Sequence, residues 1–120
     1  MDYVGKLSLP FSRGQRLTKP AEFQLVFRQG KRLKIHGFII HYRVNNLTHP
    51  RLGLAIAKKV VKTAVQRNSI KRAIRESFRQ NQESISSLDI VFVARHGLSN
   101  IPLNELRAIL FKVWQRLNNA

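Results

Sequence analysis

The stretch from Thr63 to Asn81 constrains the fold most strongly, because it divides into an apolar side and a cationic side. At about 100° per residue, the apolar or small side chains fall on one arc of a helix: Ile70, Ala73, Ile74, Ser77 and Phe78. The opposite arc carries Arg67, Asn68, Lys71, Arg72, Arg75 and Arg79. The apolar arc of such a helix must be covered by a core, so the pattern predicts a packed domain with one strongly basic helix face.

The charge of the whole chain agrees with that basic face. The chain has 22 Lys and Arg against 6 Asp and Glu, a net charge of +16 in 120 residues. Hydrophobic residues make up 43% of it, enough to form a core, and the length suits one domain spanning residues 1–120. Because such a charge opposes folding by self-repulsion, we expect a polyanionic partner.

Several classes of protein are excluded by what the sequence lacks. It contains no cysteine, which excludes disulfides and thiolate metal sites. Its longest apolar runs, such as Ile90 to Ala94, are far shorter than the ~18 residues of a membrane span. The N-terminus has no basic start followed by an apolar stretch. We therefore expect a cytoplasmic protein with no membrane partner.

Hydrophobic periodicity predicts a small α+β fold. Residues 1–17 show no periodicity and are interpreted as a basic flexible arm. The expected elements are a helix from an N-cap at Thr18 to a stop at Gly30, strands at 35–44, 51–57 and 89–95, the basic helix, and a last helix through Leu103 and Leu117. The order is α-β-β-α-β-α, and the strand-helix-strand unit predicts a parallel pair within a mixed sheet.

The second predicted strand has one face made only of Gly53, Ala55 and Ala57. Such a face predicts the close approach of either a helix or a ligand. Phe23 and Phe27, one helical turn apart, fit two interpretations: core packing, or an exposed platform beside this face on which the bases of single-stranded RNA stack.

The chain offers few groups for catalysis. Its six acids are scattered, whereas two-metal cleavage of a phosphodiester needs several carboxylates at one site. The four histidines show no metal-ligand spacing, although a histidine base whose partners meet only in space stays open. We expect no catalytic residue, no metal site and no cofactor on the protein itself.

Nucleic-acid binding is better supported. Eight cations lie within 22 residues: Lys58, Lys59, Lys62, Arg67, Lys71, Arg72, Arg75 and Arg79. With few acids nearby, their repulsion disfavours the helix unless phosphates neutralise it. The alternative is a merely solvated helix face. Asn68, among the cations, fits either a surface amide or a contact to phosphate or base.

The run from Arg51 to Lys59, followed by Ala64 to Phe78, resembles the protein component of bacterial ribonuclease P. In that family a glycine-containing strand ends in Lys-Lys and precedes a helix with an Arg-Asn-Arg signature. The Phe-x-x-Val-Phe segment from Phe23 to Phe27 and the strand at 89–95 match as well. The resemblance covers roughly residues 13–117.

The resemblance implies an α-β sandwich whose β-α-β crossover is left-handed, against the usual right-handed rule. It implies that a large RNA, with Mg²⁺ in the holoenzyme, cleaves the 5′ leader from precursor tRNA, and that the protein alone is not catalytic. One protein would bind one catalytic RNA subunit and help to hold the precursor tRNA.

Position by position, the resemblance assigns catalytic-RNA contacts to Arg67, Asn68, Lys71, Arg72 and Arg75, flanked by Lys58 and Lys59. The adjoining cations Lys62 and Arg79 complete our candidate surface. The leader-binding cleft would hold Phe23, Phe27, His41, Ala55 and Ala57.

Two positions depart from the family pattern. Ser69 replaces the second arginine of the signature, and His41 replaces an aromatic residue, which puts base stacking at that position in question. The alternative functions are a structural RNA-binding protein of the ribosomal type and an autonomous nuclease.

Overall fold

The structure is a computed structural model, and it describes residues 13–118. Its helices and strands follow the chain in this order: η1 (Arg13–Gln15), α2 (Pro20–Gln29), β1 (Lys31–Ile35), β2 (Phe38–Val44), β3 (Arg51–Ala55), α3 (Ala64–Asn81), η2 (Gln82–Ser84), β4 (Leu88–Ala94), η3 (Leu98–Asn100) and α4 (Leu103–Asn118). The predicted α+β class is confirmed. Among the described residues, no helix is both long and apolar enough to cross a membrane.

The four strands form one mixed sheet in the order β1-β2-β4-β3. The β3 and β4 strands are parallel and are joined through α3, while the other two pairs are antiparallel. The expected parallel pair is therefore present. The left hand of its crossover stays a prediction.

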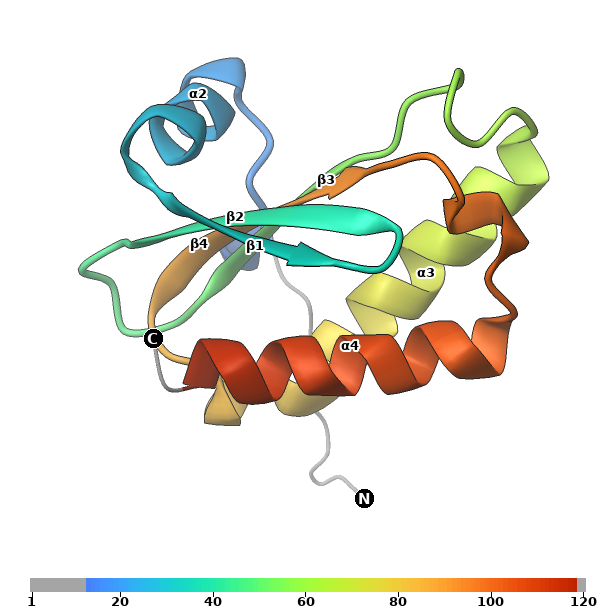
Figure 1. Ribbon diagram of the computed structural model, residues 1–120. Coiled ribbons are helices and arrows are strands. Elements are labelled where there is room, and N and C mark those ends of the chain that lie inside the picture. Colours follow the sequence, from blue (N-terminus) through green and yellow to red (C-terminus); the bar gives the residue numbers. More distant parts are fainter. Residues whose placement is uncertain (1–12, 119–120) are drawn as a thin grey trace.

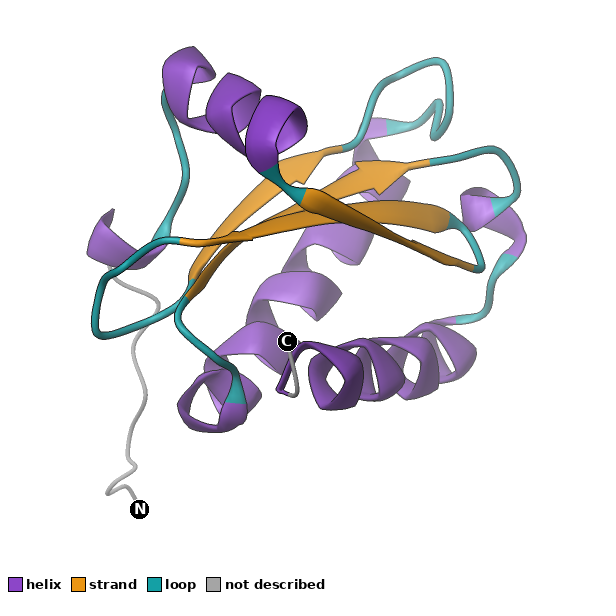
Figure 2. Cartoon of the chain, turned by 60° about the vertical axis from the view of Figure 1, so that its left-hand side comes forward, coloured by secondary structure: helices purple, strands orange, loops and turns teal. Residues whose placement is uncertain are grey.

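Helices lie on both faces of the sheet (Figures 1 and 2). α3 and α4 cover one face, and the main hydrophobic core lies between them and the sheet. α2 lies on the opposite face, over β2 and β4, where a smaller cluster is built around Val26 and Val91. α2 crosses only part of that face (Figure 1), and beside it Ile39, Ala55 and Val93 are half-buried.

The structure contains one more strand than the sequence predicted, so the observed order is α-β-β-β-α-β-α. The predicted strand at 35–44 contains β2 and only the last residue of β1. The turn between the two strands lies at His36 and Gly37, with a left-handed φ of +86° at the glycine. The additional strand, β1, was missed because it is a basic edge strand in which only Leu33 is buried. Cations on an edge strand prevent further pairing, and they also hide the apolar alternation.

The ends of α2 differ slightly from the prediction. The N-cap is Lys19 rather than Thr18. Glu22 Oε1 accepts hydrogen bonds from the backbone N–H groups of Thr18, at 3.1 Å, and Lys19, at 3.0 Å. At the other end Gly30 stops the helix in an extended conformation. A Cβ at Gly30 would lie 2.4 Å from the carbonyl oxygen of Val26, so close approach of the backbone explains this glycine.

The basic helix forms as the sequence predicted. Thr63 is its N-cap, and the threonine Oγ1 accepts from the backbone N–H of Gln66 at 3.2 Å. Ile70, Ile74 and Phe78 are buried against the sheet and α4. The seam with α4 is fixed by Trp114, whose Nε1 donates to the hydroxyl of Ser77 at 2.7 Å.

The small-residue face of β3 receives α2, one of the two predicted occupants. Phe23 packs so closely on Gly53 that a Cβ there would lie 2.7 Å from the ring atom Cζ. The other face of β3 enters the main core through Leu52. The strand ends at Ala55 rather than Ala57.

The end of the expected flexible arm is folded against the sheet. Arg16 forms a parallel bridge with Leu52, and the backbone N–H of Leu17 donates to the Leu52 carbonyl at 2.9 Å. The side chain of Leu17 is buried. The expectation of a loose arm was therefore wrong for residues 16 and 17, because pairing with a distant strand holds them. Residues 1–12 of that arm lie outside the described residues.

Candidate nucleic-acid interface

The predicted cations gather on the side of α3 that faces away from the core and in the loop before it. Most of the candidate residues are exposed: Lys58, Lys59, Lys62, Asn68, Arg72 and Arg75. The remaining three are half-buried: Arg67, Lys71 and Arg79. The helix therefore presents a fixed array of guanidinium and ammonium groups.

Two of these arginines have partners that the sequence did not reveal. The Nη1 of Arg67 donates to the carbonyl oxygens of Val61, at 2.9 Å, and Lys62, at 3.0 Å. These bonds tie the preceding loop to the first turns of α3, so Arg67 also has a structural role. Arg79 forms an ion pair with Glu76, one turn earlier, which reduces the positive charge at that end of the helix.

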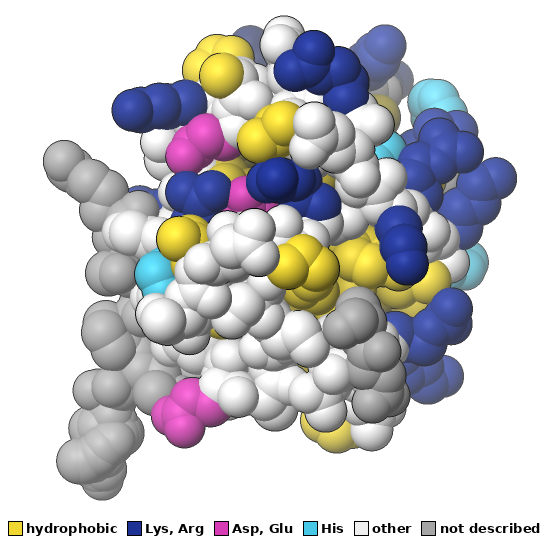
Figure 3. All heavy atoms as spheres, turned by 90° about the vertical axis from the view of Figure 1, so that its left-hand side faces the viewer, with side chains coloured by type: hydrophobic (Ala, Val, Ile, Leu, Met, Phe, Trp, Pro, Cys, Tyr) yellow, Lys and Arg dark blue, Asp and Glu magenta, His cyan; other side chains and the backbone are white. Residues whose placement is uncertain are grey.

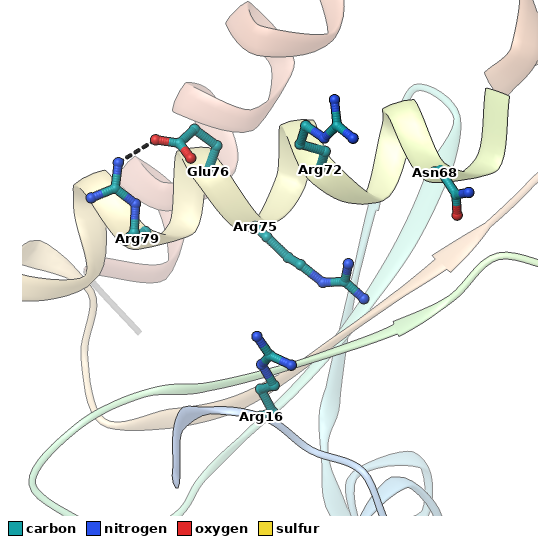
Figure 4. Close-up of a pocket in the computed structure, with 6 residues that line it drawn as sticks. All are labelled: Arg16, Asn68, Arg72, Arg75, Glu76 and Arg79. Atoms are coloured by element: carbon teal, nitrogen blue, oxygen red, sulfur yellow. Dashed lines mark hydrogen bonds and ion pairs between the residues drawn. The ribbon is translucent and has the colours of Figure 1, made fainter. Parts of the chain in front are cut away.

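A hollow of about 370 Å³ lies between the N-terminal segment and α3 (Figure 4). It is lined by Arg16, Asn68, Arg72, Arg75, Glu76 and Arg79. The side chains of Arg16 and Arg75 point toward each other across it. The pKa of Arg75 is lowered by partial burial and by the positive charge of Arg16. Two guanidinium groups held in this way form a suitable site for a phosphate.

Arg16 is a functional candidate that sequence reasoning missed, since it was assigned to the arm. A neighbouring hollow of about 170 Å³ is also lined by Arg16 and Arg75, together with Lys71 and the edge strand β3. The basic surface thus extends from α3 to the edge of the sheet. The arginines before the first predicted helix were the available signal in the sequence. Only the structure shows that one of them, Arg16, is bridged to Leu52 on β3 and lines a hollow together with residues of α3.

Aromatic side chains meet on the opposite face of the sheet. The rings of Phe27 and His41 contact each other edge to face, with centroids 4.8 Å apart. Phe23 lies 6.4 Å from Phe27, centroid to centroid. Phe27 is 41% exposed, whereas Phe23 is half-buried against Gly53. Phe23 therefore packs in the fold, as the first interpretation expected, and Phe27 presents an exposed ring. Base stacking on that ring stays a prediction.

The surroundings of His41 favour its neutral form. Partial burial and the nearby charge of Arg32 lower its pKa. Its Nδ1 is buried and has no hydrogen-bond partner among the described residues. Burying an acceptor without a partner costs less than burying an N–H donor, so the proton is best placed on Nε2, where it can be donated to a ligand.

The predicted floor of the cleft is only partly assembled. In the sheet register Ala55 pairs with Val93, and Val93 pairs with Ile39, so these three residues form a half-buried strip across the face beside Phe27 and His41. Ala57 lies beyond the end of β3 and is exposed, so the strand does not bring it into this strip. Cations border the face at its β1 edge, and Figure 3 shows Lys and Arg side chains crowded along one side of the molecule.

Two of the six acids serve the fold. Arg51 donates to both carboxylate oxygens of Asp89, from Nε at 2.8 Å and from Nη2 at 2.7 Å, and its Nη1 reaches Glu22 at 3.1 Å. Hydrogen bonding and the charge of Asp89 raise the pKa of Arg51. Within residues 13–118 no group of three or more His, Asp or Glu side chains could hold a metal ion.

Comparison with known proteins identifies the family. A sequence model described as ribonuclease P matches residues 11–118. The ribonuclease P protein component of Pseudomonas putida is 50% identical over 113 residues, which cover 92% of this chain and 84% of the relative. That of Haemophilus influenzae is 46% identical, and the match covers 92% of each chain. The ribonuclease P protein of Staphylococcus aureus has the same fold, with a TM-score of 0.79, 32% identity, and coverage of 85% of this chain and 94% of that one.

These matches set aside both the ribosomal-type protein and the autonomous nuclease. The relatives and the solved structure belong to one family of subunits that work with an RNA. The cationic helix and the mixed sheet of this chain are consistent with that family. The chain belongs to the family of bacterial ribonuclease P protein components, the protein subunits of the endoribonuclease that processes tRNA.

Proposed function

We propose that this chain holds two RNAs on two faces: the RNA subunit of ribonuclease P along α3, and the single-stranded 5′ leader of precursor tRNA on the face that carries α2. The observation that carries the leader site is the contact of Phe27 with His41. It places an exposed aromatic ring and a hydrogen-bond donor beside an open, nearly uncharged strip of sheet.

The α3 side suits a folded RNA. Its hydrogen-bond donors lie on a helix that three large apolar side chains anchor in the core. Because the helix is already fixed, little conformational entropy is lost when phosphates bind. Arginine predominates there, and its planar fork matches two phosphate oxygens at once. Our candidates for this contact are the nine predicted residues, with Arg16 added.

The α2 side suits a single strand. Bases stack on aromatic faces whatever their identity, which is what a leader of variable sequence requires. Phe27 would provide the stacking surface, and Ile39, Val93 and Ala55 would form the smooth floor. His41 would donate to an acceptor on a base or phosphate. The departure from an aromatic residue at His41 therefore replaces stacking area by a hydrogen bond.

The described side chains do not fit a catalytic metal, because they form no carboxylate cluster. We assign no metal-dependent step to them. We propose that Mg²⁺ belongs with the RNA and that the protein reduces the repulsion between catalytic RNA and precursor tRNA. One protein would serve one RNA, in the cytoplasm where tRNA is made.

The direct test is reconstitution with the ribonuclease P RNA and measurement of 5′-leader removal at low Mg²⁺. The protein should raise the rate and the affinity for precursor tRNA. If it stimulates neither, the proposed function is wrong.

Phe27→Ala tests the leader site. Base stacking on an aromatic ring is worth about 1–3 kcal/mol, so the variant should bind precursor tRNA about tenfold more weakly and mature tRNA normally. Leu47→Ala is the matched control, because Leu47 is 42% exposed, close to the 41% of Phe27, and lies in the loop between β2 and β3. An equal loss for both tRNAs would contradict leader binding at Phe27.

A further inference from the structure

A further groove runs along the seam between α3 and α4, and it shares only Arg72 with the α3 surface proposed above. It has a volume of about 630 Å³, which lies within the range of about 300–1,000 Å³ common for ligand sites. Its α4 wall includes Leu103, Arg107 and Phe111, at intervals of four residues. Its α3 wall includes Arg72 and Gln80.

The α4 wall exposes apolar surface that the fold does not use. Phe111 is 54% exposed and Leu103 is 41% exposed, although their helix buries Leu106, Leu110 and Trp114 in the core. Because Leu103 and Phe111 line one groove together, they form a small apolar patch, which is a candidate contact surface.

The charge of the groove favours an anion. Arg107 lies one helical turn before Phe111, and Arg72 lies opposite on α3. The acidic member of the lining, Glu76, forms an ion pair with Arg79. Figure 4 shows the guanidinium of Arg72 on the side of α3 away from Arg16, so the basic surface of the helix continues around it toward α4.

The charge and the exposed apolar area of the groove distinguish between the molecules that could bind in it. A second copy of the chain would bring a second net charge of +16 against the first. Two partly exposed apolar residues also provide much less than the ~800 Å² per partner of a standard interface. A nucleotide satisfies the site better, because its base can stack on Phe111 while its phosphates meet the arginines. The side-chain oxygen of Gln80 can accept from a base edge, while its Nε2 donates to Glu76 at 3.4 Å.

We propose that the α3–α4 groove binds an unpaired nucleotide of the ribonuclease P RNA, with its base against Phe111 and its phosphates between Arg72 and Arg107. This inference rests on the proposed function, because it assumes that the RNA subunit lies along α3. It extends that interface over a second helix, which would fix the rotation of the RNA about the axis of α3.

Stacking predicts a specific order among substitutions at Phe111. In filter binding to the RNA subunit, Phe111→Leu should weaken affinity about tenfold, whereas Phe111→Tyr should keep it within about twofold. Apolar contact with a protein would instead tolerate leucine. Thermal unfolding checks that both variants fold, which the exposure of this side chain leads us to expect. Equal affinities for the two variants would overturn the proposal.

The arginine contact is tested by the salt dependence of binding. Arg107→Gln should reduce the slope of log affinity against log salt by about one. Arg116→Gln is the control on the same helix, because Arg116 is exposed but does not line the groove. If Arg107→Gln leaves the slope as unchanged as the control does, no phosphate lies at Arg107.

Crosslinking in the reconstituted holoenzyme gives an independent result even if a Phe111 variant folds poorly. The chain has no cysteine, so Gln80→Cys, labelled with an azidophenacyl group, places one photoreactive probe in the groove. It should attach to one discrete site in the RNA, and Thr48→Cys, in the loop between β2 and β3, should not. Attachment to a second protein chain, or no attachment, would overturn the inference.

The experiments distinguish a wrong assignment of the α3–α4 groove from a wrong proposed function. If the wild-type chain stimulates leader removal but the Phe111 variants and the probe give negative results, only the groove is excluded. If the wild-type chain itself gives no stimulation, the proposed function is wrong as a whole.

Discussion

Arg16 and Arg75 point toward each other across the hollow between the N-terminal segment and α3, although both are positively charged (Figure 4). Their elements come together because Arg16 bridges to Leu52 on the edge strand β3 and α3 follows that strand. The pKa of Arg75 is lowered by partial burial and by Arg16. The fold thus holds two like charges near each other, an arrangement that an anion relieves.

Inorganic sulfate or phosphate should therefore stabilise the folded protein. An anion at ten times its dissociation constant would add about 1.4 kcal/mol to the free energy of unfolding, measured as a rise in Tm at constant ionic strength. Arg75→Gln should raise Tm at low salt and reduce the response to sulfate. An undiminished response in Arg75→Gln would place the anion elsewhere.

Removing Arg51 should damage the fold more than removing any surface arginine. Asp89 is 1% exposed, and its carboxylate accepts from Arg51 and from the amide of Asn45. Arg51→Ala leaves that charge buried without its main partner, so we expect a loss of about 3–5 kcal/mol in chemical denaturation. Arg116→Ala is the exposed control and should change stability by less than about 0.5 kcal/mol. A loss below about 1 kcal/mol for Arg51→Ala would show that Asp89 is not dependent on this pair.

Gly30→Ala should be destabilising although its φ is ordinary. The added Cβ would lie 2.4 Å from the carbonyl oxygen of Val26 and 2.6 Å from that of Tyr42, both backbone atoms. Relief requires α2 to move relative to β2, at a cost of about 1–3 kcal/mol or more. Urea unfolding measures this cost. Since the shift would also displace Phe27, affinity for precursor tRNA should fall too, and a variant as stable as the wild type would contradict the close approach.

His41 should make the fold less stable in mild acid. Its pKa is lowered in the folded state, so the unfolded chain takes up a proton first as the pH falls through about 6.5. The free energy of unfolding should therefore fall between pH 7 and pH 5.5, by less than about 1 kcal/mol because the side chain is partly exposed. His41→Phe should remove this part of the pH dependence, whereas His96→Phe, at an exposed position in the turn after β4, should keep it. An identical profile for wild type and His41→Phe would show that His41 does not contribute.

The sequence predicted those helices and strands whose hydrophobic periodicity and caps lie within one continuous segment. The basic helix, with its cap at Thr63 and its buried Ile70 and Ile74, follows directly from a period of 3.6 residues. Edge strand β1 does not, because its cations mask the only buried side chain, Leu33. The folded position of Leu17 could not be predicted, since the partner of its backbone N–H is the distant Leu52.

The candidate binding surfaces likewise divide into contacts within one segment, which the sequence predicted, and contacts between distant segments, which it did not. Spacing alone places the cations of α3 on one arc, but no spacing brings Arg16 to that helix. Phe23 and Phe27 are adjacent by helical periodicity, whereas the contact of Phe27 with His41 depends on how α2 crosses β2. The resemblance supplied His41 as a candidate, and the structure supplied the reason that it meets a phenylalanine.

The position of β4 in the sheet has a consequence for synthesis. β4 lies between β2 and β3, yet it follows both of them in the chain, and Arg51 is 38 residues before its partner Asp89. A nascent chain that has not yet exposed β4 outside the ribosome can form the β1–β2 hairpin, but β3 has no neighbouring strand and α3 has no sheet to cover. The strongly cationic segment 58–79 must therefore emerge before the fold can hold it, beside the RNA of the ribosome, which is itself a large polyanion. The domain becomes committed to its structure only when its last strand is complete.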